Sequence, residues 1–250
     1  MTRILVLWED KFFQKLDTCL RRALRTLREA GTSGAEITAF GVNGHGGFDP
    51  FIRADWPIAA RRGFLRSSGS IDHLVCIADA DKATTCCTIE DPPRAPARTD
   101  NWVIRASNAW TTKLRATAPF APDRIHGHFL RWNSESLLIA AHDVEPALHK
   151  LQCRNREALA AFLRNDCDPT PGNLPPEMFV EQFRKPQGCL EKMLAAGGAP
   201  PHRKGSVPRD DALDETSRTA LDRLLGRVPD LLSIAQLLQR LADAGAPTRA

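Results

Sequence analysis

The sequence predicts an α/β fold in which a mostly parallel sheet is flanked by helices and followed by a helical C-terminal region. From residue 3 to about residue 145, apolar segments typical of buried strands alternate with segments of helical spacing. This alternation is typical of parallel α/β sheets. After about residue 148 no strand pattern is evident. We therefore expect an α/β domain over residues 1–147 and a helical region over residues 148–250 that packs on or near the site.

Four segments are predicted to be strands, because each contains an apolar run of strand length. The first is RILVLWED, and the third, IDHLVCIADADK, carries two aspartates at its end. In a parallel sheet the carboxyl ends of the strands form the edge at which ligands gather. The predicted strands cover residues 3–10, 35–42, 71–82 and 123–133.

Helices are predicted between these strands from their apolar spacing and their end signals. Gly31 is expected to stop the first helix, and Asp55 and Ser134 are expected to cap two others. The glycine-rich segment NGHGGFDPF is expected to be a loop. The predicted helices of this half cover residues 11–31, 55–68, 101–118 and 134–142.

The C-terminal half combines amphipathic helical segments with polar loops. One loop is rich in proline, and another, APPHRKGSVPRDD, is basic. The predicted helices cover residues 157–165, 178–198 with a break before Pro186, 215–225 and 231–245.

Composition favours a cytoplasmic globular protein. The chain has 250 residues, 42% of them apolar and 26% charged, and it holds no apolar run of the roughly 18 residues that would span a membrane. The N-terminal segment reaches Glu9 and Asp10 too early for a signal peptide. The seven cysteines are scattered without the spacing of a zinc knuckle and are expected to be reduced thiols. No membrane partner is expected.

The charge gives weak support for a polyanionic partner. The net charge is +4, and 26 arginines outnumber eight lysines. Arginine suits phosphate recognition through its planar fork, although a GC-rich genome also produces an excess of arginine. The absence of tyrosine excludes any mechanism that needs a phenol nucleophile.

Acidic residues follow three of the predicted strands at their carboxyl ends. Glu9 follows the first strand, Asp79 and Asp81 end the third, and Glu135 comes just after the fourth. Clustered carboxylates repel one another, and hard divalent cations with oxygen ligands relieve that repulsion. We expect Glu9, Asp79 and Asp81 to bind Mg²⁺ or Mn²⁺, which favours phosphodiester cleavage by metal-activated water. The plainer interpretation is that these strands simply end in water.

The arrangement LVLWEDKFF, helix, strand, LVCIADADK resembles the Toprim fold, which carries a glutamate after its first strand and an aspartate-x-aspartate after its third. Glu9, Asp79 and Asp81 match those positions. More narrowly, the chain resembles small stand-alone Toprim-like proteins of bacterial defence and mobile loci. The resemblance covers about the first 145 residues, and it departs from many Toprim nucleases directly after Glu9.

The resemblance implies a metal-dependent nuclease that acts in antiviral defence on DNA or RNA. A topoisomerase would need a tyrosine, and a primase usually has a zinc domain, and the sequence shows neither. The resemblance also implies a fourth acid, Glu135, and a lysine in a basic C-terminal loop, Lys204. Lys82 and Arg203 are further candidates for binding the nucleic-acid backbone.

Other interpretations stay open at this point. Glu135 also fits a plain interaction with a helix dipole, and His126 and His128 share a strand face without an obvious third metal ligand. The chain lacks a GxxxxGK[ST] loop, so an inactive or latent subunit that works with a partner ATPase or another defence protein is the main alternative. A phosphohydrolase for nucleotides is the third. The sequence leaves open whether the chain forms a homo-oligomer.

Overall fold

The computed structural model describes parts of the chain in two compact units. The first unit covers residues 1–90, 103–130 and 230–250, and the second covers residues 91–102 and 131–229. The described residues are 2–9, 17, 20–21, 24–25, 35–42, 44–53, 70–80, 83–87, 99–130, 148, 151–165, 186–201 and 229–244.

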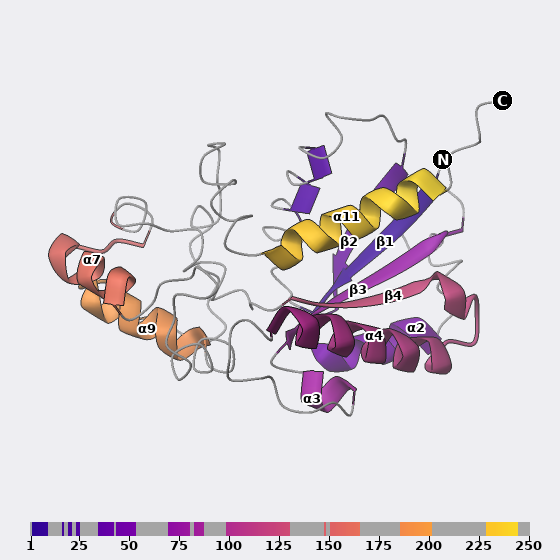
Figure 1. Ribbon diagram of the computed structural model, residues 1–250, viewed down its shortest axis with the longest axis horizontal. Helices are drawn as coiled ribbons and strands as arrows, with labels where there is room; N and C mark the ends of the chain where they lie inside the picture. Colours follow the sequence, from indigo (N-terminus) through magenta and orange to yellow (C-terminus); the bar gives the residue numbers. More distant parts are fainter. Residues whose placement is uncertain are drawn as a thin grey trace. The chain divides into compact units, whose positions relative to one another are not determined.

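The first unit is built on a four-stranded parallel sheet (Figure 1), which confirms the predicted α/β class. The order of the strands is β2-β1-β3-β4, so β1 and β3 are central and hydrogen-bonded to each other. The strands are β1 (Thr2–Trp8), β2 (Ala35–Gly41), β3 (His73–Asp79) and β4 (Ile125–Leu130), each within the range expected from its apolar run except for Thr2 at the start of β1.

The burial of each strand follows from its place in the sheet. From Ile4 to Trp8 every residue of β1 is buried, as is every residue of β3 from Leu74 to Ala78. Continuous apolar runs are what strands covered on both faces require. The edge strand β2 is only half-buried, and its Phe40 is 36% exposed.

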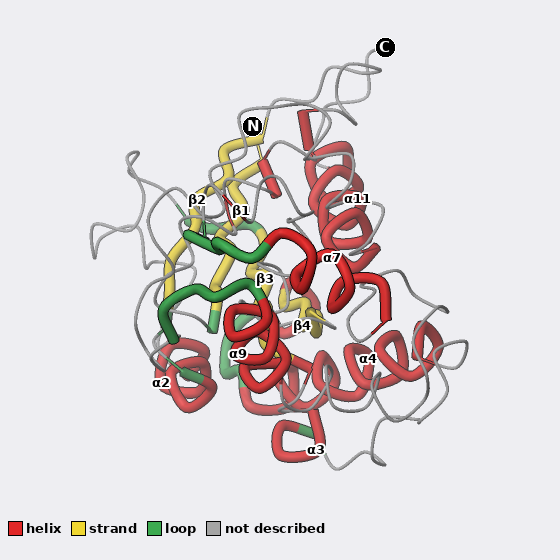
Figure 2. The backbone as a smooth tube through the Cα atoms, turned by 90° about the vertical axis from the view of Figure 1, so that its left-hand side faces the viewer, coloured by secondary structure: helices red, strands yellow, loops and turns green. Residues whose placement is uncertain are grey.

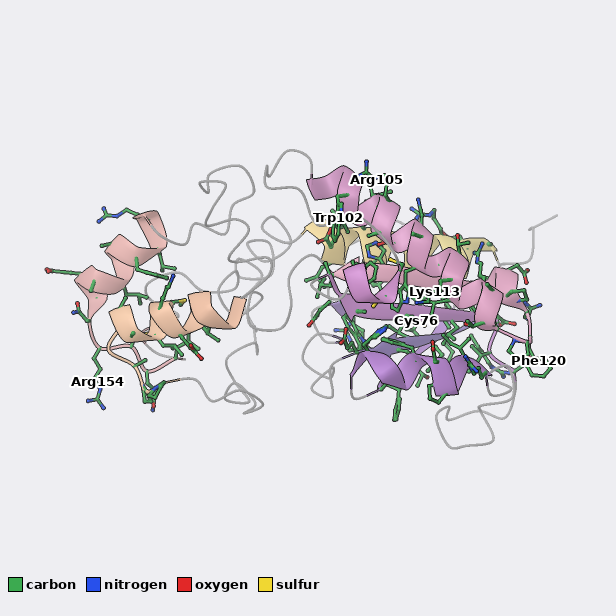
Figure 3. All side chains as sticks on the ribbon, turned by 90° about the horizontal axis from the view of Figure 1, so that it is seen from below. Cys76, Trp102, Arg105, Lys113, Phe120 and Arg154 are labelled. Atoms are coloured by element: carbon green, nitrogen blue, oxygen red, sulfur yellow. The ribbon has the colours of Figure 1, made fainter. Side chains whose placement is uncertain are left out.

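Helices cover both faces of this sheet (Figures 1 and 2). Helices α2 (Phe48–Arg53) and α4 (Thr99–Thr117) lie over one face, and α11 (Pro229–Ala244) lies over the other. Thr2 on β1 donates a hydrogen bond to the carbonyl of Ala242 on α11. A short helix, α3 (Ala83–Cys86), follows β3. Figure 3 shows Phe120, exposed in the turn between α4 and β4.

An aromatic cluster fixes α2 and α4 against the sheet. The Trp110 ring stacks on Phe129 of β4 with centroids 4.7 Å apart, and Phe48 meets Trp110 edge-on at 5.3 Å. Gly127 on β4 allows this approach, because a Cβ atom there would lie 2.9 Å from Trp110 Cε3. The cluster places α4 directly against β4.

Side chains of α4 also form hydrogen bonds with the backbone groups at the outer edge of β4. Ser107 Oγ accepts a hydrogen bond from the Phe129 amide, and Thr111 Oγ1 both accepts from the Gly127 amide and donates to its carbonyl. Arg115 Nε donates to the Ile125 carbonyl at 2.9 Å. Side chains four residues apart on one helix face therefore match backbone groups two residues apart on the strand.

The second unit contains α7 (Arg156–Asn165) and α9 (Pro186–Ala196). Asn155 Oδ1 accepts from the Ala158 amide and so caps the start of α7. The amides of Arg154 and Asn155 both donate to the carbonyl of Gly197, directly after α9. Gly198, at φ 64°, ends α9 in the left-handed conformation that favours glycine.

One feature differs from the sequence-based expectation. Residues 48–51 were expected in a loop but start α2, and its first turn, with Asp49 and Pro50, suits both residue types. Helix α9 begins at Pro186, which agrees with the expected break before that residue, because proline is tolerated in the first turn of a helix. Helix α11, from the expected helical region, belongs to the unit of the sheet. Where the structure describes helices, none is both long and apolar enough to cross a membrane.

Candidate functional site at the carboxyl edge of the sheet

The carboxyl ends of β1 and β3 lie side by side, because the two strands are parallel neighbours. Trp8 is the register partner of Ile77, and the Glu9 amide continues the ladder by donating to the Ile77 carbonyl at 2.9 Å. Glu9 is therefore held at the sheet edge by backbone geometry. Any residue at the end of β3 must lie next to it.

Glu9 and Asp79, which are 70 residues apart in sequence, meet at this edge. The Asp79 amide donates a hydrogen bond to Glu9 Oε2 at 3.1 Å. Both residues are half-buried, between the apolar strands and water. A carboxylate that accepts a backbone amide is held in one orientation. The two acids expected to share a site are thus adjacent.

The loop after β2 is attached to the same edge. The Val42 amide donates to the Trp8 carbonyl, and the Gly44 amide donates to the Glu9 carbonyl at 2.7 Å. Gly44 has φ 100°, which favours glycine. Gly47 packs so closely that a Cβ atom there would lie 2.2 Å from the Val42 carbonyl oxygen. Residues 44–47 are therefore held against the end of β1.

The same loop places the imidazole of His45 in contact with the thiol of Cys86. His45 Nδ1 lies 3.1 Å from Cys86 Sγ, and Cys86 is fully buried in α3. Lys113 on α4, labelled in Figure 3, donates to the Cys86 carbonyl. The sequence alone does not predict this thiol–imidazole pair. The adjacent cysteines and the glycine-rich loop were visible, but no local pattern joins them.

The remaining predicted site residues lie outside the described residues. The structure describes β3 as far as Ala80, which is buried, and resumes at Ala83. The predicted site residues outside the described ranges are Asp81, Lys82, Glu135, Arg203 and Lys204.

The histidines of β4 take separate partners instead of forming one site together. His126 Nε2 lies 3.5 Å from His73 Nδ1 on β3. His128 donates through Nδ1 to the Phe129 carbonyl at 2.9 Å, and the carboxylate of Asp230 on α11 acts on it electrostatically. His126 and His128 do share one strand face, as alternation requires.

Burial keeps these imidazoles neutral. Desolvation, together with the charges of His73 and Arg115, lowers the pKa of His126 to about 4, although Asp123 opposes the shift. Desolvation also lowers the pKa of His73 and of His128, although Asp72 and Asp230, respectively, oppose the shift. Neutral rings are the state in which histidine accepts hydrogen bonds or binds metal ions.

The acid pair fits a hard divalent cation by its donor chemistry. Glu9 and Asp79 offer carboxylate oxygens, the ligands that Mg²⁺ and Mn²⁺ prefer, and Mg²⁺ is usually bound by only one or two protein carboxylates. Over the described ranges, no three or more His, Cys, Asp or Glu side chains are grouped closely enough to hold an ion. Asp81 lies outside those ranges, two residues after Asp79.

Comparisons with known proteins assign no family to the chain. No protein-family model, curated protein or solved structure matches the chain. The site must therefore be interpreted from its own residues.

Proposed function

We propose that this chain is a metal-dependent nuclease that hydrolyses phosphodiester bonds in DNA or RNA, acting in bacterial antiviral defence. The observation that carries the proposal is the contact between Glu9 and Asp79 across neighbouring parallel strands. The resemblance of these acids to the Toprim pattern supports it. So does their position, because ligands of α/β sheets bind beyond the carboxyl ends of the strands.

In this proposal Glu9 and Asp79, with Asp81, hold Mg²⁺ or Mn²⁺. The chemistry that the ion supplies when bound is activation of water and neutralisation of the charge that develops on phosphorus. The amide of Asp79 keeps the Glu9 carboxylate oriented before substrate arrives. Preorganisation of this kind lowers the reorganisation needed in the transition state.

The remaining roles follow from the sequence. Glu135 would add a fourth carboxylate, and Lys204 or Lys82 would stabilise the charge on the transferring phosphoryl group. Arg203 and other basic side chains would hold the phosphate backbone without reading bases.

The test is cleavage of labelled DNA and RNA with Mn²⁺ or Mg²⁺ by the purified chain, compared with Glu9→Gln and Asp79→Asn. Each substitution removes one carboxylate charge and keeps the size of the side chain. We expect each to lower the cleavage rate at least a hundredfold, in line with the loss of a preorganised electrostatic group. Asp243→Asn, on the exposed end of α11, is the matched control and should cleave at the parent rate.

Equal cleavage by all four proteins would contradict the proposal, because the activity would then come from a contaminant. Absence of cleavage by the parent chain, followed by cleavage after addition of a partner ATPase, would favour the latent-subunit interpretation. Turnover of small phosphate esters without cleavage of polymers would favour a nucleotide phosphohydrolase.

A further inference from the structure

The pair of histidines on β3 and β4 is a cluster that the proposed function does not use. His73 begins β3, and His126 is the second residue of β4. Their ring centroids lie 5.5 Å apart with the planes tilted by 47°, and His73 Nδ1 lies 3.5 Å from His126 Nε2. One ring nitrogen of each residue therefore points toward the other.

The distance between these nitrogens suits a shared ion better than a direct hydrogen bond. An N–H donor in a good hydrogen bond lies about 2.9–3.0 Å from its acceptor, clearly less than the 3.5 Å observed. Two imidazole nitrogens that bind one tetrahedral zinc ion at about 2.0–2.1 Å lie about 3.4 Å apart. The pair needs almost no movement to reach that geometry.

The surroundings allow a cation to enter. Both rings are half-buried, so solvent reaches them, and desolvation favours the neutral form that binds metals. The carboxylates of Asp72 and Asp123 lie near enough to His73 to act on it electrostatically, and Asp123 also acts on His126. Arg124 opposes this effect at His73, and Arg115 opposes it at His126. The local charge is thus balanced, which predicts a site of moderate affinity.

We propose that His73 and His126 bind a divalent transition ion of the zinc type, with water in its remaining positions. Imidazole selects such ions over Mg²⁺, which prefers oxygen ligands. The bound ion would cross-link the amino ends of β3 and β4. This site lies far from the acid pair, because β3 runs six residues from His73 to Asp79, about 20 Å at the usual rise of a strand.

The thiol–imidazole pair of Cys86 and His45 is the rival site for the same ion. Its sulfur and nitrogen are 3.1 Å apart, the spacing of direct contact, and Cys86 is fully buried. An ion with attached water would have to force these two residues apart. The histidine pair is therefore the better site, and the two can be told apart by experiment.

The test is a Co²⁺ titration of the full chain in excess Mg²⁺, which occupies carboxylate sites. Visible absorption reports the coordination of the cobalt, and thermal unfolding with and without Zn²⁺ reports linkage to folding. We expect one bound ion, no intense sulfur-to-cobalt absorption, and a higher Tm with Zn²⁺. His73→Asn and His126→Asn should each weaken binding at least tenfold and remove the Tm shift, whereas His45→Asn should change neither.

A second measurement on the parent chain guards against variants that fold poorly. Diethyl pyrocarbonate modifies accessible imidazoles, and mass spectrometry locates the modified residues. Zn²⁺ should protect His73 and His126 and leave the reactivity of His45 unchanged. Loss of binding in His45→Asn, or equal modification of His73 and His126 with and without Zn²⁺, would overturn the proposal. Neither result depends on nuclease activity, so the two proposals fail separately.

Discussion

Gly47 shows how a single residue shapes the carboxyl edge of the sheet. A Cβ atom there would lie 2.2 Å from the Val42 carbonyl oxygen and 2.8 Å from Val42 Cβ. The clash is mainly with backbone and cannot be relieved by rotation of a flexible side chain. The neighbouring Gly46 is exposed, and a Cβ atom there would meet nothing within 4 Å.

We therefore predict that Gly47→Ala destabilises the protein and loosens the loop that contacts Glu9. Overpacking of this kind costs about 1–3 kcal/mol. Urea unfolding should show a lower midpoint for Gly47→Ala, and the Gly44 amide, which donates to the Glu9 carbonyl, should exchange faster with solvent. Gly46→Ala is the matched control and should leave both unchanged. Equal behaviour of the two variants would show that the loop is not tightly held.

Individual residues differ in how far sequence alone could place them. The proximity of Glu9 and Asp79 could be predicted, because the carboxyl ends of parallel strands share one edge of the sheet and the apolar runs located those ends. The contact between His45 and Cys86 could not, since it depends on how a loop and a short helix pack. The pairing of His126 with His73 likewise required the order of the strands.

At the scale of the element, the packing of α4 along β4 explains how an edge strand is protected. An open edge exposes backbone donors and acceptors that can pair with another chain. Ser107, Thr111 and Arg115 meet these groups from one face of α4. The apolar spacing of residues 101–118 predicted the helix but not the contacts of these three polar side chains with β4. Polar residues in a helix pattern usually indicate only an exposed face.

Thr111→Val tests this edge directly. Valine keeps the shape of threonine but removes the hydroxyl that bonds both the amide and the carbonyl of Gly127. Leaving buried backbone groups unsatisfied costs about 1–3 kcal/mol, so we expect a lower unfolding midpoint and faster exchange of the Gly127 amide. Thr112→Val is the control, because its hydroxyl bonds only the Asn108 carbonyl on the exposed side of the same helix. A loss of stability as large in Thr112→Val would contradict this explanation.

For the whole molecule, the sequence predicted the α/β class of the fold but did not indicate which later helix joins the unit of the sheet. Strand and helix patterns are local, so the order of elements in the sheet domain could be inferred without tertiary information. The membership of α11 in the unit of the sheet could not be inferred in this way, because its amphipathic pattern requires an apolar partner without specifying which one. The Thr2–Ala242 hydrogen bond joins residues 240 positions apart, and no local signal marks it.

The half-buried histidines of β3 and β4 make the stability of the sheet unit depend on pH. His126 has a pKa of about 4 in the folded protein, against 6.5 for an ordinary histidine. Between these values the unfolded chain binds a proton that the folded chain does not, so stability must fall as pH decreases. The contribution is fully present above about pH 6.5 and is lost toward pH 4. His73 and His128 act in the same direction, because burial lowers the pKa of both.

We therefore predict that the free energy of unfolding falls between pH 7 and pH 4.5, by at most about 1.4 kcal/mol per pH unit for each such proton. Urea unfolding across this range, with a chelator to remove metal ions, measures the slope. His126→Asn should reduce that slope, because asparagine does not titrate, whatever its effect on the absolute stability. The ring proton signal of His126 should in turn titrate near pH 4 by NMR. A midpoint near 6.5, or a slope unchanged by the substitution, would contradict the lowering of the His126 pKa by desolvation.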